Sequence, residues 1–295
     1  MLFRSAARRR VGRNAETDFY TASTSGAVFG ELITAAATTL LGRADPREFA
    51  FVEIGAEAPA PGQPAPGILQ GVSHPFGAAR TIPLGHEMAL SGPCVVFANE
   101  LLDAQPFERF AFRRGGWRRL GVAEREGRLA EVELPGPATA DFLPARAPEG
   151  YLVDAPLAAT TLLEKIAAQP WTGLFLTCDY GRTLHELLTE YPAGTARAYH
   201  RHRQSNELLA QPGEQDLTCH LCWDWLADTL RRHGFVEPKV ETQESFFVKH
   251  AGAFLAAASA AEAKGLSQRK LALMQLLHPA HLGQKFQVLH ANRPG

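Results

Sequence analysis

Three side chains that could do chemistry come after a compact apolar run from Cys94 to Ala98: Asn99 and Glu100 follow it directly, and Asp103 comes next. The run predicts a buried strand that carries an amide and two carboxylates at its carboxyl end. In open α/β sheets, this end of the strands is where ligands bind. We therefore take this stretch as the chemical centre of the chain, and Asn99, Glu100 and Asp103 as its candidate catalytic residues.

A second apolar run, from Gly173 to Cys178, ends at Asp179 and Tyr180. It predicts another buried strand with an acid at its carboxyl end. Parallel strands end at the same edge of a sheet, so this acid is expected near the first group. Asp179 and Tyr180 are candidate substrate-binding residues.

A third run, Phe49 to Gly55, predicts a strand that ends in a glycine and leads to Glu57. A glycine at this place in a βα unit lets the backbone approach a cofactor. Glu53 lies inside the apolar run and needs a partner or an edge position, because burial of an unpaired carboxylate is costly. A structural role and a cofactor-binding role both remain open for it.

The segment Ala58 to Gly67 contains four prolines and no charged residue. Proline inside a helix costs about 3 kcal/mol or more, so this segment cannot form the helix expected after the first strand. We expect a loop that leads into a possible short strand, Gly67 to Val72, and another at Ala79 to Leu84.

The remaining pattern alternates helices and strands. Helices are predicted at residues 25–41, 156–168, 183–190, 223–233 and 251–264, and terminal strands at 238–242 and 244–250. A hairpin is predicted from residues 107–113 and 117–124 around Gly115-Gly116, with a third strand at 128–134. The expected fold is α/β, a doubly wound, mostly parallel sheet with antiparallel hairpin additions and helical elaborations. We expect one domain over residues 18–290, with 107–134 as an excursion.

Composition limits the partners and the compartment. The chain has 295 residues, 45% of them hydrophobic, and a formal net charge of -1, which argues against nucleic acid or an anionic membrane as a partner bound by bulk charge. It has no run of about 18 apolar residues that would cross a bilayer. The four cysteines fit reduced thiols, so a cytoplasmic location is expected. Residues 1–17 are expected to be a flexible basic tail, with a mitochondrial presequence as the alternative.

The sequence Cys219-His220-Leu221-Cys222 invites a zinc interpretation. A structural zinc site usually takes four ligands from two paired motifs, and the sequence has no second cysteine pair. We therefore expect no metal at this motif.

Taken together, an ordered set of motifs resembles the MidA family, the bacterial and mitochondrial relatives of the complex I assembly methyltransferase. The matching segments span roughly residues 18 to 290. They are 18–21 with 29–32, 52–55, 98–106, 179–181, 212–213 with 216–220, and 283–289.

This resemblance implies a Rossmann-like fold, S-adenosyl-L-methionine (SAM) as cofactor and protein arginine methylation as activity. It places SAM over the strand that ends at Gly55, with Asn99 and Glu100 beside the methyl donor. The segment that contains His220 would edge the pocket, and His220 is a candidate substrate-binding residue. The implied cofactor-binding residues are Thr21, Glu53, Gly55 and Glu57.

The chain departs from the family pattern on the cofactor side. Only Gly55 remains of the glycine-rich turn, and the proline-rich loop replaces the next helix. Gln70 to Phe76 offers only Ser73 and His74 where an acid is expected to hold the SAM ribose. Two functions are therefore weighed: a SAM-dependent methyltransferase acting on a protein nitrogen, or a catalytically degenerate protein of the same fold that acts as a binding or assembly module.

Overall fold

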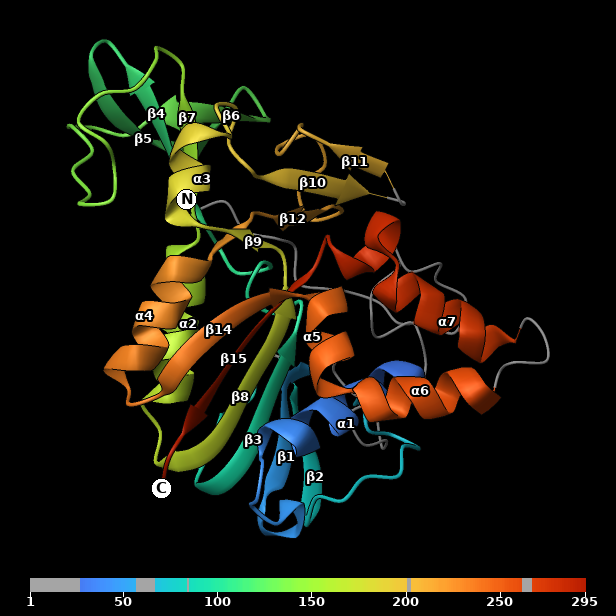
Figure 1. The fold of residues 1–295 in the computed structure, drawn as a ribbon. Coiled ribbons are helices and arrows are strands. Elements are labelled where there is room, and N and C mark those ends of the chain that lie inside the picture. Colours follow the sequence, from blue (N-terminus) through green and yellow to red (C-terminus); the bar gives the residue numbers. More distant parts are fainter. Residues whose placement is uncertain (1–26, 57–66, 84, 201–202, 262–266) are drawn as a thin grey trace. The chain divides into compact units, whose positions relative to one another are not determined.

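The computed structural model describes residues 27–56, 67–83, 85–200, 203–261 and 267–295 (Figure 1). These residues form two compact units. The sheet unit contains the described residues up to Leu101 together with Glu164–Asp179 and Ala227–Gly295, and the meander unit contains Leu102–Leu163 and Tyr180–Leu226. None of the helices in the described ranges combines the length and hydropathy that crossing a bilayer requires.

A six-stranded sheet forms the centre of the sheet unit, in the order β14-β15-β8-β3-β1-β2 (Figure 1). Five strands run parallel and β15 runs opposite to them. The bounds are β1 Ala50–Ala56, β2 Ala78–Pro83, β3 Gly92–Asn99, β8 Trp171–Asp179, β14 Val236–Thr242 and β15 Gln287–Arg293.

Strand β1 marks the point where the strand order reverses. The chain passes from β1 outward to the edge strand β2 and then returns to β3 on the other side of β1. The inner strands are buried on both faces, which explains the continuous apolar runs in their sequences. The predicted α/β fold, a doubly wound and mostly parallel sheet, is confirmed.

Helix α1 (Ala27–Leu40) packs against this sheet through a group of buried aromatic rings. The Phe29 ring lies 6.1 Å from Phe97 of β3 and 6.3 Å from Phe247, measured between ring centroids. Phe97 in turn lies 6.0 Å from Phe51 of β1. These edge-to-face and tilted contacts join the helix to the two strands at the reversal point. The described part of the predicted helix 25–41 is thereby confirmed.

The prediction of a strand at Glu244 to His250 is wrong, because this segment is helix α5 (Gln243–His250). The Thr242 hydroxyl accepts a hydrogen bond from the Ser245 amide at 3.2 Å and caps the first turn. The aromatic pair Phe246-Phe247 favoured a strand, but both rings are buried on the helix. The cap and this burial outweigh the local β propensity.

Further helical segments complete the sheet unit. Helix α6 lies within the predicted helix 251–264, and α7 precedes β15 in the last segment. Their bounds are α6 Gly252–Ala261 and α7 Gln268–Leu277, with short turns η2 Pro46–Glu48 (3-10) and η3 Pro279–Gly283 (π).

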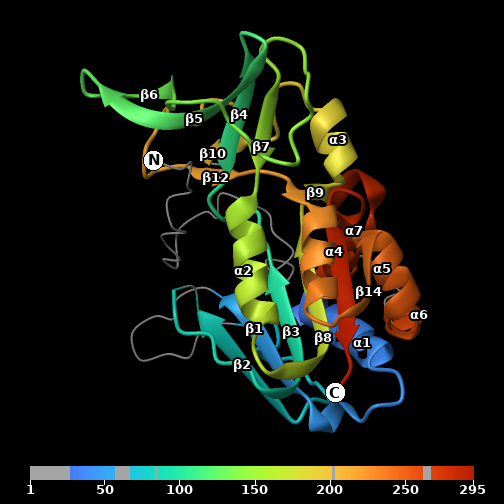
Figure 2. The same ribbon diagram turned by 90° about the vertical axis from the view of Figure 1, so that its left-hand side faces the viewer.

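The meander unit contains a four-stranded antiparallel sheet, in the order β6-β5-β4-β7 (Figure 2). Its strands are β4 Glu108–Arg113, β5 Gly116–Arg125, β6 Arg128–Glu133 and β7 Leu152–Ala155. The hairpin and third strand are as predicted, but the first turn is shifted by one residue. It is Arg114-Gly115, both with positive φ, and Gly116 pairs with Arg113 inside the strand. Two-residue turns with positive φ at both positions match the twist of the strands.

Smaller elements follow in the same unit. Strands β10 Arg197–His200, β11 Arg203–Ser205 and β12 Asp216–Thr218 form one sheet, and β9 Gly181–Arg182 pairs with β13 Leu221–Cys222. Helix α3 (Leu184–Thr189) begins with a capping box between Thr183 and Glu186. Helices α2 (Leu157–Ala167) and α4 (Trp223–Arg232) each contain the boundary between the units. The predicted helices 156–168, 183–190 and 223–233 are confirmed.

A buried ion pair fixes the meander unit. Asp154 of β7 accepts hydrogen bonds from the Arg109 guanidinium of β4 at 2.7 and 3.2 Å. The same carboxylate accepts from the Thr195 and Ala196 amides at 2.8 Å each. Its side chain has no exposed surface, and that of Arg109 is 10% exposed. Four hydrogen bonds therefore satisfy a carboxylate that is removed from water.

Replacement of this acid should destabilise the unit strongly. In Asp154→Asn, Arg109 loses its closest buried counter-charge, and we expect a loss of about 3 kcal/mol in unfolding free energy. The matched control is Glu131→Gln, because Glu131 lies 3.6 Å from the same guanidinium but is 31% exposed. It should cost under about 1 kcal/mol. Urea denaturation followed by tryptophan fluorescence measures both; equal losses in the two variants would contradict the assignment.

Candidate functional site

The carboxyl ends of β1, β3 and β8 lie side by side in the sheet unit. Ile54 pairs with Ala98, and Asn99 pairs with Cys178. The strand ends therefore bring Gly55, Asn99 and the acids that follow to one edge of the sheet, at the point where the strand order reverses. This is the expected ligand-binding edge of such a sheet.

Gly55 turns the chain at the end of β1. Its φ is +83°, in the left-handed region that favours glycine, and the strand register shifts between Ile54 and Ala56. A Cβ atom at this position would lie only 2.6 Å from the Leu101 side chain. Both the conformation and the packing therefore require glycine here.

Asn99 and Glu100 form a hydrogen-bonded pair at the end of β3. The Asn99 amide nitrogen donates to Glu100 Oε1 at 3.0 Å, and the Glu100 backbone amide donates to the Cys178 carbonyl at 3.0 Å. Glu100 is 5% exposed and has a φ of +47°, an uncommon conformation outside glycine. Asn99 Oδ1 is buried and has no hydrogen-bond partner among the described residues. An orphaned acceptor of this kind is a suitable contact for a ligand.

Glu100 and Asp179 place two buried acids on neighbouring strand ends. Asp179 closes β8 and has no exposed surface. Burial raises the pKa of the intervening Cys178 thiol well above its ordinary value, and the charges of Asp179 and Glu100 raise it further. The two carboxylates therefore concentrate negative charge at this edge.

Asp103, the third candidate catalytic residue, lies in the meander unit and is 4% exposed. Its charge acts on Tyr199 of β10. Burial raises the pKa of the Tyr199 hydroxyl, and Asp103 raises it further. Within the meander unit, the Asp103 carboxylate therefore lies close enough to Tyr199 to act on its hydroxyl through charge.

Tyr180 and His220 also belong to the meander unit. The Tyr180 carbonyl accepts a hydrogen bond from the Leu221 amide at 2.9 Å, which fixes the segment next to His220. Burial, followed by the charges of Arg182 and Arg197, lowers the pKa of His220 to about 4. The imidazole is therefore neutral at pH 7, and its buried Nδ1 has no hydrogen-bond partner among the described residues.

Glu53 is held by the chain itself. Its Oε2 accepts a hydrogen bond from the Ile68 amide at 2.7 Å, and the side chain is buried. Burial raises the pKa of this carboxyl from 4.5 to about 7, although the hydrogen bond opposes the shift. The structural partner of Glu53, which sequence reasoning left open, is therefore the segment that follows the proline-rich loop.

The prediction of a short strand at Gly67 to Val72 is wrong, because this segment forms turns. The Gln70 amide bonds to the Gly67 carbonyl and the Val72 amide to the Leu69 carbonyl, both at 3.0 Å, and Gly71 has a φ of +74°. The second strand is β2, Ala78–Pro83, close to the other predicted strand. An acid after the second strand is therefore to be sought beyond Pro83, where the exposed Glu87 follows.

Two predicted cofactor-binding residues, Thr21 and Glu57, lie outside the described residues. The same holds for residues 58–66 of the proline-rich segment. The cysteines of the Cys219-to-Cys222 motif are buried, and no disulfide joins them within the described residues. The site assignments for all the candidate residues stay predictions.

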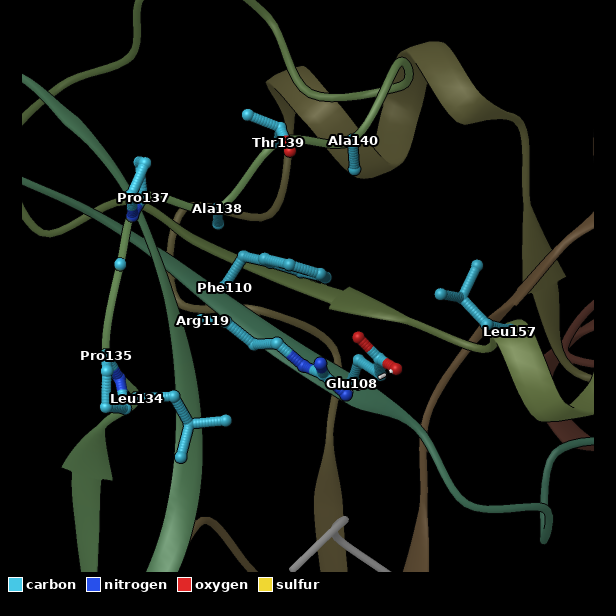
Figure 3. A pocket seen from close by; sticks show the side chains of 11 residues that line it. Glu108, Phe110, Arg119, Leu134, Pro135, Pro137, Ala138, Thr139, Ala140 and Leu157 are labelled. Atoms are coloured by element: carbon cyan, nitrogen blue, oxygen red, sulfur yellow. Dashed lines mark hydrogen bonds and ion pairs between the residues drawn. The ribbon is translucent and has the colours of Figure 1, made fainter.

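A pocket of about 510 Å³ lies in the meander unit (Figure 3). The segment 134–140 lines it, together with Glu108 and Arg119, which form an ion pair of 2.8 Å. None of the candidate site residues lines this pocket. Its lining therefore adds nothing to the chemistry of the strand ends.

Comparison with known proteins decides the family. Residues 77–239, more than half of the chain, match a family described as "Putative S-adenosyl-L-methionine-dependent methyltransferase". The chain belongs to this family. It is therefore a SAM-dependent methyltransferase by family membership, and SAM is its cofactor. No curated protein matches the sequence.

Two solved structures from Burkholderia thailandensis are similar to this methyltransferase in fold. One is a COG1565 superfamily member, titled a "likely methyl transferase" and bound to S-adenosyl-homocysteine. It has 21% sequence identity and a TM-score of 0.79, covering 98% of this chain and 82% of the other. The second is a native structure from the same superfamily with 20% identity and a TM-score of 0.76, covering 98% and 84%. The family match over residues 77–239 confirms the methyltransferase family that the motifs resemble.

The residues at the edge of the methyltransferase sheet fit a cofactor such as SAM. Gly55, with its positive φ, turns the backbone at the end of β1, and Asn99 Oδ1 offers a buried acceptor on the neighbouring strand. Backbone at a glycine turn and a polar group on the adjacent strand are what a nucleoside needs at this position. Gly55 and Asn99 would therefore hold the cofactor.

The raised pKa of Glu53 predicts a pH dependence of stability. Its pKa is about 7 in the folded protein against an ordinary value of 4.5, so the folded form binds more protons between these pH values. Stability should fall as pH rises through this window, by about 3 kcal/mol, and this contribution should level off above it. Glu53→Gln keeps an acceptor for the Ile68 amide but cannot ionise.

The difference in unfolding free energy between Glu53→Gln and the wild type should therefore grow with pH in favour of the variant. Urea denaturation at several pH values from about 4.5 to about 7.5 measures it. Glu48→Gln, at an exposed acid in the same unit, is the matched control and should follow the wild type. A constant difference for Glu53→Gln would show that this carboxyl is not buried as described.

Proposed function

We propose that this methyltransferase modifies a nitrogen atom of a protein substrate, and that the acceptor is an arginine side chain. The observation that supports this proposal is the pair of buried acids, Glu100 and Asp179, on neighbouring strand ends. Glu100 follows β3, the strand next to β1, and Asp179 ends β8 on the other side of β3. In this proposal the cofactor lies at Gly55, near the end of β1. Donor and acceptor groups would therefore meet at one sheet edge.

The chemistry of arginine suits these residues. A guanidinium stays charged at all physiological pH values and presents donors in a rigid planar fork. Carboxylates accept two of these hydrogen bonds in parallel, and in a buried site such charge-assisted bonds are stronger than at the surface. Glu100 is further fixed by its bond from Asn99, so its carboxylate can orient the plane of a guanidinium. Orientation of this kind makes one nitrogen face the methyl donor.

The cofactor supplies an electrophilic methyl group. When a guanidinium nitrogen takes a methyl group, one N–H proton must leave, and a carboxylate within hydrogen-bond reach can accept it. In this proposal Glu100 orients the acceptor and takes the proton, and Asp179 stabilises the positive charge.

The proposed partner is a protein substrate or an assembly partner. The nearly balanced charge of the chain does not favour nucleic acid, whereas the acidic strand ends favour a local cationic group. All four cysteines are buried and form no disulfide within the described residues, which fits the reducing cytoplasm as the proposed location. A mitochondrial location remains the alternative.

A degenerate module of the same fold is the second candidate. It is favoured by Glu53, whose carboxyl is held by the Ile68 amide, and by the exposed position of Glu87 after β2. Such a protein would bind its partner through the acidic edge without methyl transfer. The two candidates differ in whether bound SAM gives up its methyl group.

Labelled SAM tests the proposal. The purified chain is incubated with methyl-labelled SAM and an extract from cells that lack the chain, and labelled proteins are hydrolysed to amino acids. We expect the label in methylarginine. Glu100→Gln should lower the transfer rate by about 100-fold or more, because general base catalysis by one carboxylate is of this order. Its affinity for SAM, measured by calorimetry, should stay within a few-fold of the wild type.

Glu48→Gln is the matched control, since this acid is exposed in the same unit, and it should leave the rate unchanged. Label in lysine or in nucleic acid would overturn arginine as the acceptor. A wild type that binds SAM but transfers no label would instead support the degenerate module.

A further inference from the structure

Three potential metal ligands converge in the sheet unit, from elements that are distant in sequence. Glu241 lies near the end of β14, His250 at the end of α5 and His290 in β15. Glu241 Oε2 lies 3.0 Å from His250 Nε2 and 3.7 Å from His290 Nε2. All three ligand atoms lie within 4.8 Å of one another.

These spacings suit a tetrahedral metal ion. Zinc bonds to histidine nitrogen and carboxylate oxygen are about 2.0–2.2 Å long, so ligand atoms in a tetrahedral site are about 3.3–3.5 Å apart. The two distances from Glu241 lie on either side of this range. Small movements of the side chains would bring these two distances into the range.

His290 gives an independent indication of a ligand. Its side chain is only 6% exposed, and its Nε2 atom is buried without a hydrogen-bond partner among the described residues. The atom faces Glu241 Oε2 at 3.7 Å, which is too long for a hydrogen bond. A buried nitrogen with an unused lone pair or proton normally costs stability, and a bound metal ion would remove this cost.

The surroundings hold the imidazoles in place. The Phe246 ring lies 5.0 Å from the His250 ring and 5.4 Å from the His290 ring, between centroids. The Lys249 ammonium contacts Glu241 Oε1, the oxygen that faces away from the shortest histidine contact. Lys239 is paired with His290 across the strands, and its side chain is 59% exposed. Glu241 Oε2 therefore faces the two imidazoles.

We propose that Glu241, His250 and His290 form a binding site for a divalent transition-metal ion, with zinc as the best fit. Two histidines and one carboxylate are a ligand set that zinc accepts, and a water molecule would take the fourth position. Because the ligands come from β14, α5 and β15, the ion joins helix α5 to the antiparallel end of the sheet. The site is separate from the strand ends of β1 and β3, and the proposal does not depend on the acceptor of methyl transfer.

Metal titration of the intact, chelator-treated protein tests the site. Calorimetry with Zn²⁺ should show one ion per chain, and Co²⁺ should give the strong visible absorption of a tetrahedral complex. Saturating Zn²⁺ should raise the thermal unfolding midpoint, because the ion binds only the folded form. His290→Gln and His250→Gln should each weaken zinc binding by about 100-fold or more, because each removes one of three protein ligands.

His233→Gln is the matched control. His233 pairs with Glu164 at 3.1 Å in the same unit, so the variant also removes one histidine–carboxylate contact. It should bind Zn²⁺ like the wild type. His250 is 20% exposed at the end of a helix, so His250→Gln keeps the test valid if the more buried His290→Gln does not fold. Zinc affinity that is unchanged in His250→Gln, or a wild-type protein without saturable zinc binding, would overturn the proposal.

Discussion

The parallel pairing of β1, β3 and β8 is the constraint on which the candidate site depends. Parallel strands need both faces covered, and the buried runs Phe51–Ile54 and Cys94–Ala98 satisfy this requirement. The pairing in register sets Gly55, Asn99 and Asp179 at the ends of adjacent strands. A shift of one residue would turn these side chains to the other face. Apolar packing in the interior thereby determines where the polar chemistry lies.

Much of this arrangement could be predicted from the sequence, because apolar runs and helical periodicity are local signals. The strands that end at Gly55, Asn99 and Asp179 were found in this way. The helix at Glu244 to His250 is not predicted in this way, because its aromatic residues suggest a strand. The signal that favours a helix is a single N-cap, the Thr242 hydroxyl. The predicted turn, Gly115-Gly116, lies one residue from the observed turn, Arg114-Gly115, because two consecutive glycines give the same turn signal in either register.

The site could be predicted only in part, for a physical reason. Glu100 and Asp179 carry a local signal, since each follows its own apolar strand. The partner of Glu53 is 15 residues away in sequence, beyond a proline-rich segment, and nothing local identifies the Ile68 amide. Glu241, His250 and His290 meet only because β14 and β15 pair and α5 folds back on them. Contacts of this kind depend on the tertiary structure, which motif spacing does not contain.

The central claim is that one sheet edge holds the methyl donor beside Gly55 and the acceptor beside Glu100 and Asp179. A crystal structure of the chain with S-adenosyl-homocysteine and an arginine-containing peptide tests it most directly. The account predicts the cofactor over the carboxyl end of β1 and the guanidinium within hydrogen-bond distance of Glu100 or Asp179. A cofactor bound elsewhere, or a guanidinium that contacts neither acid, would contradict it.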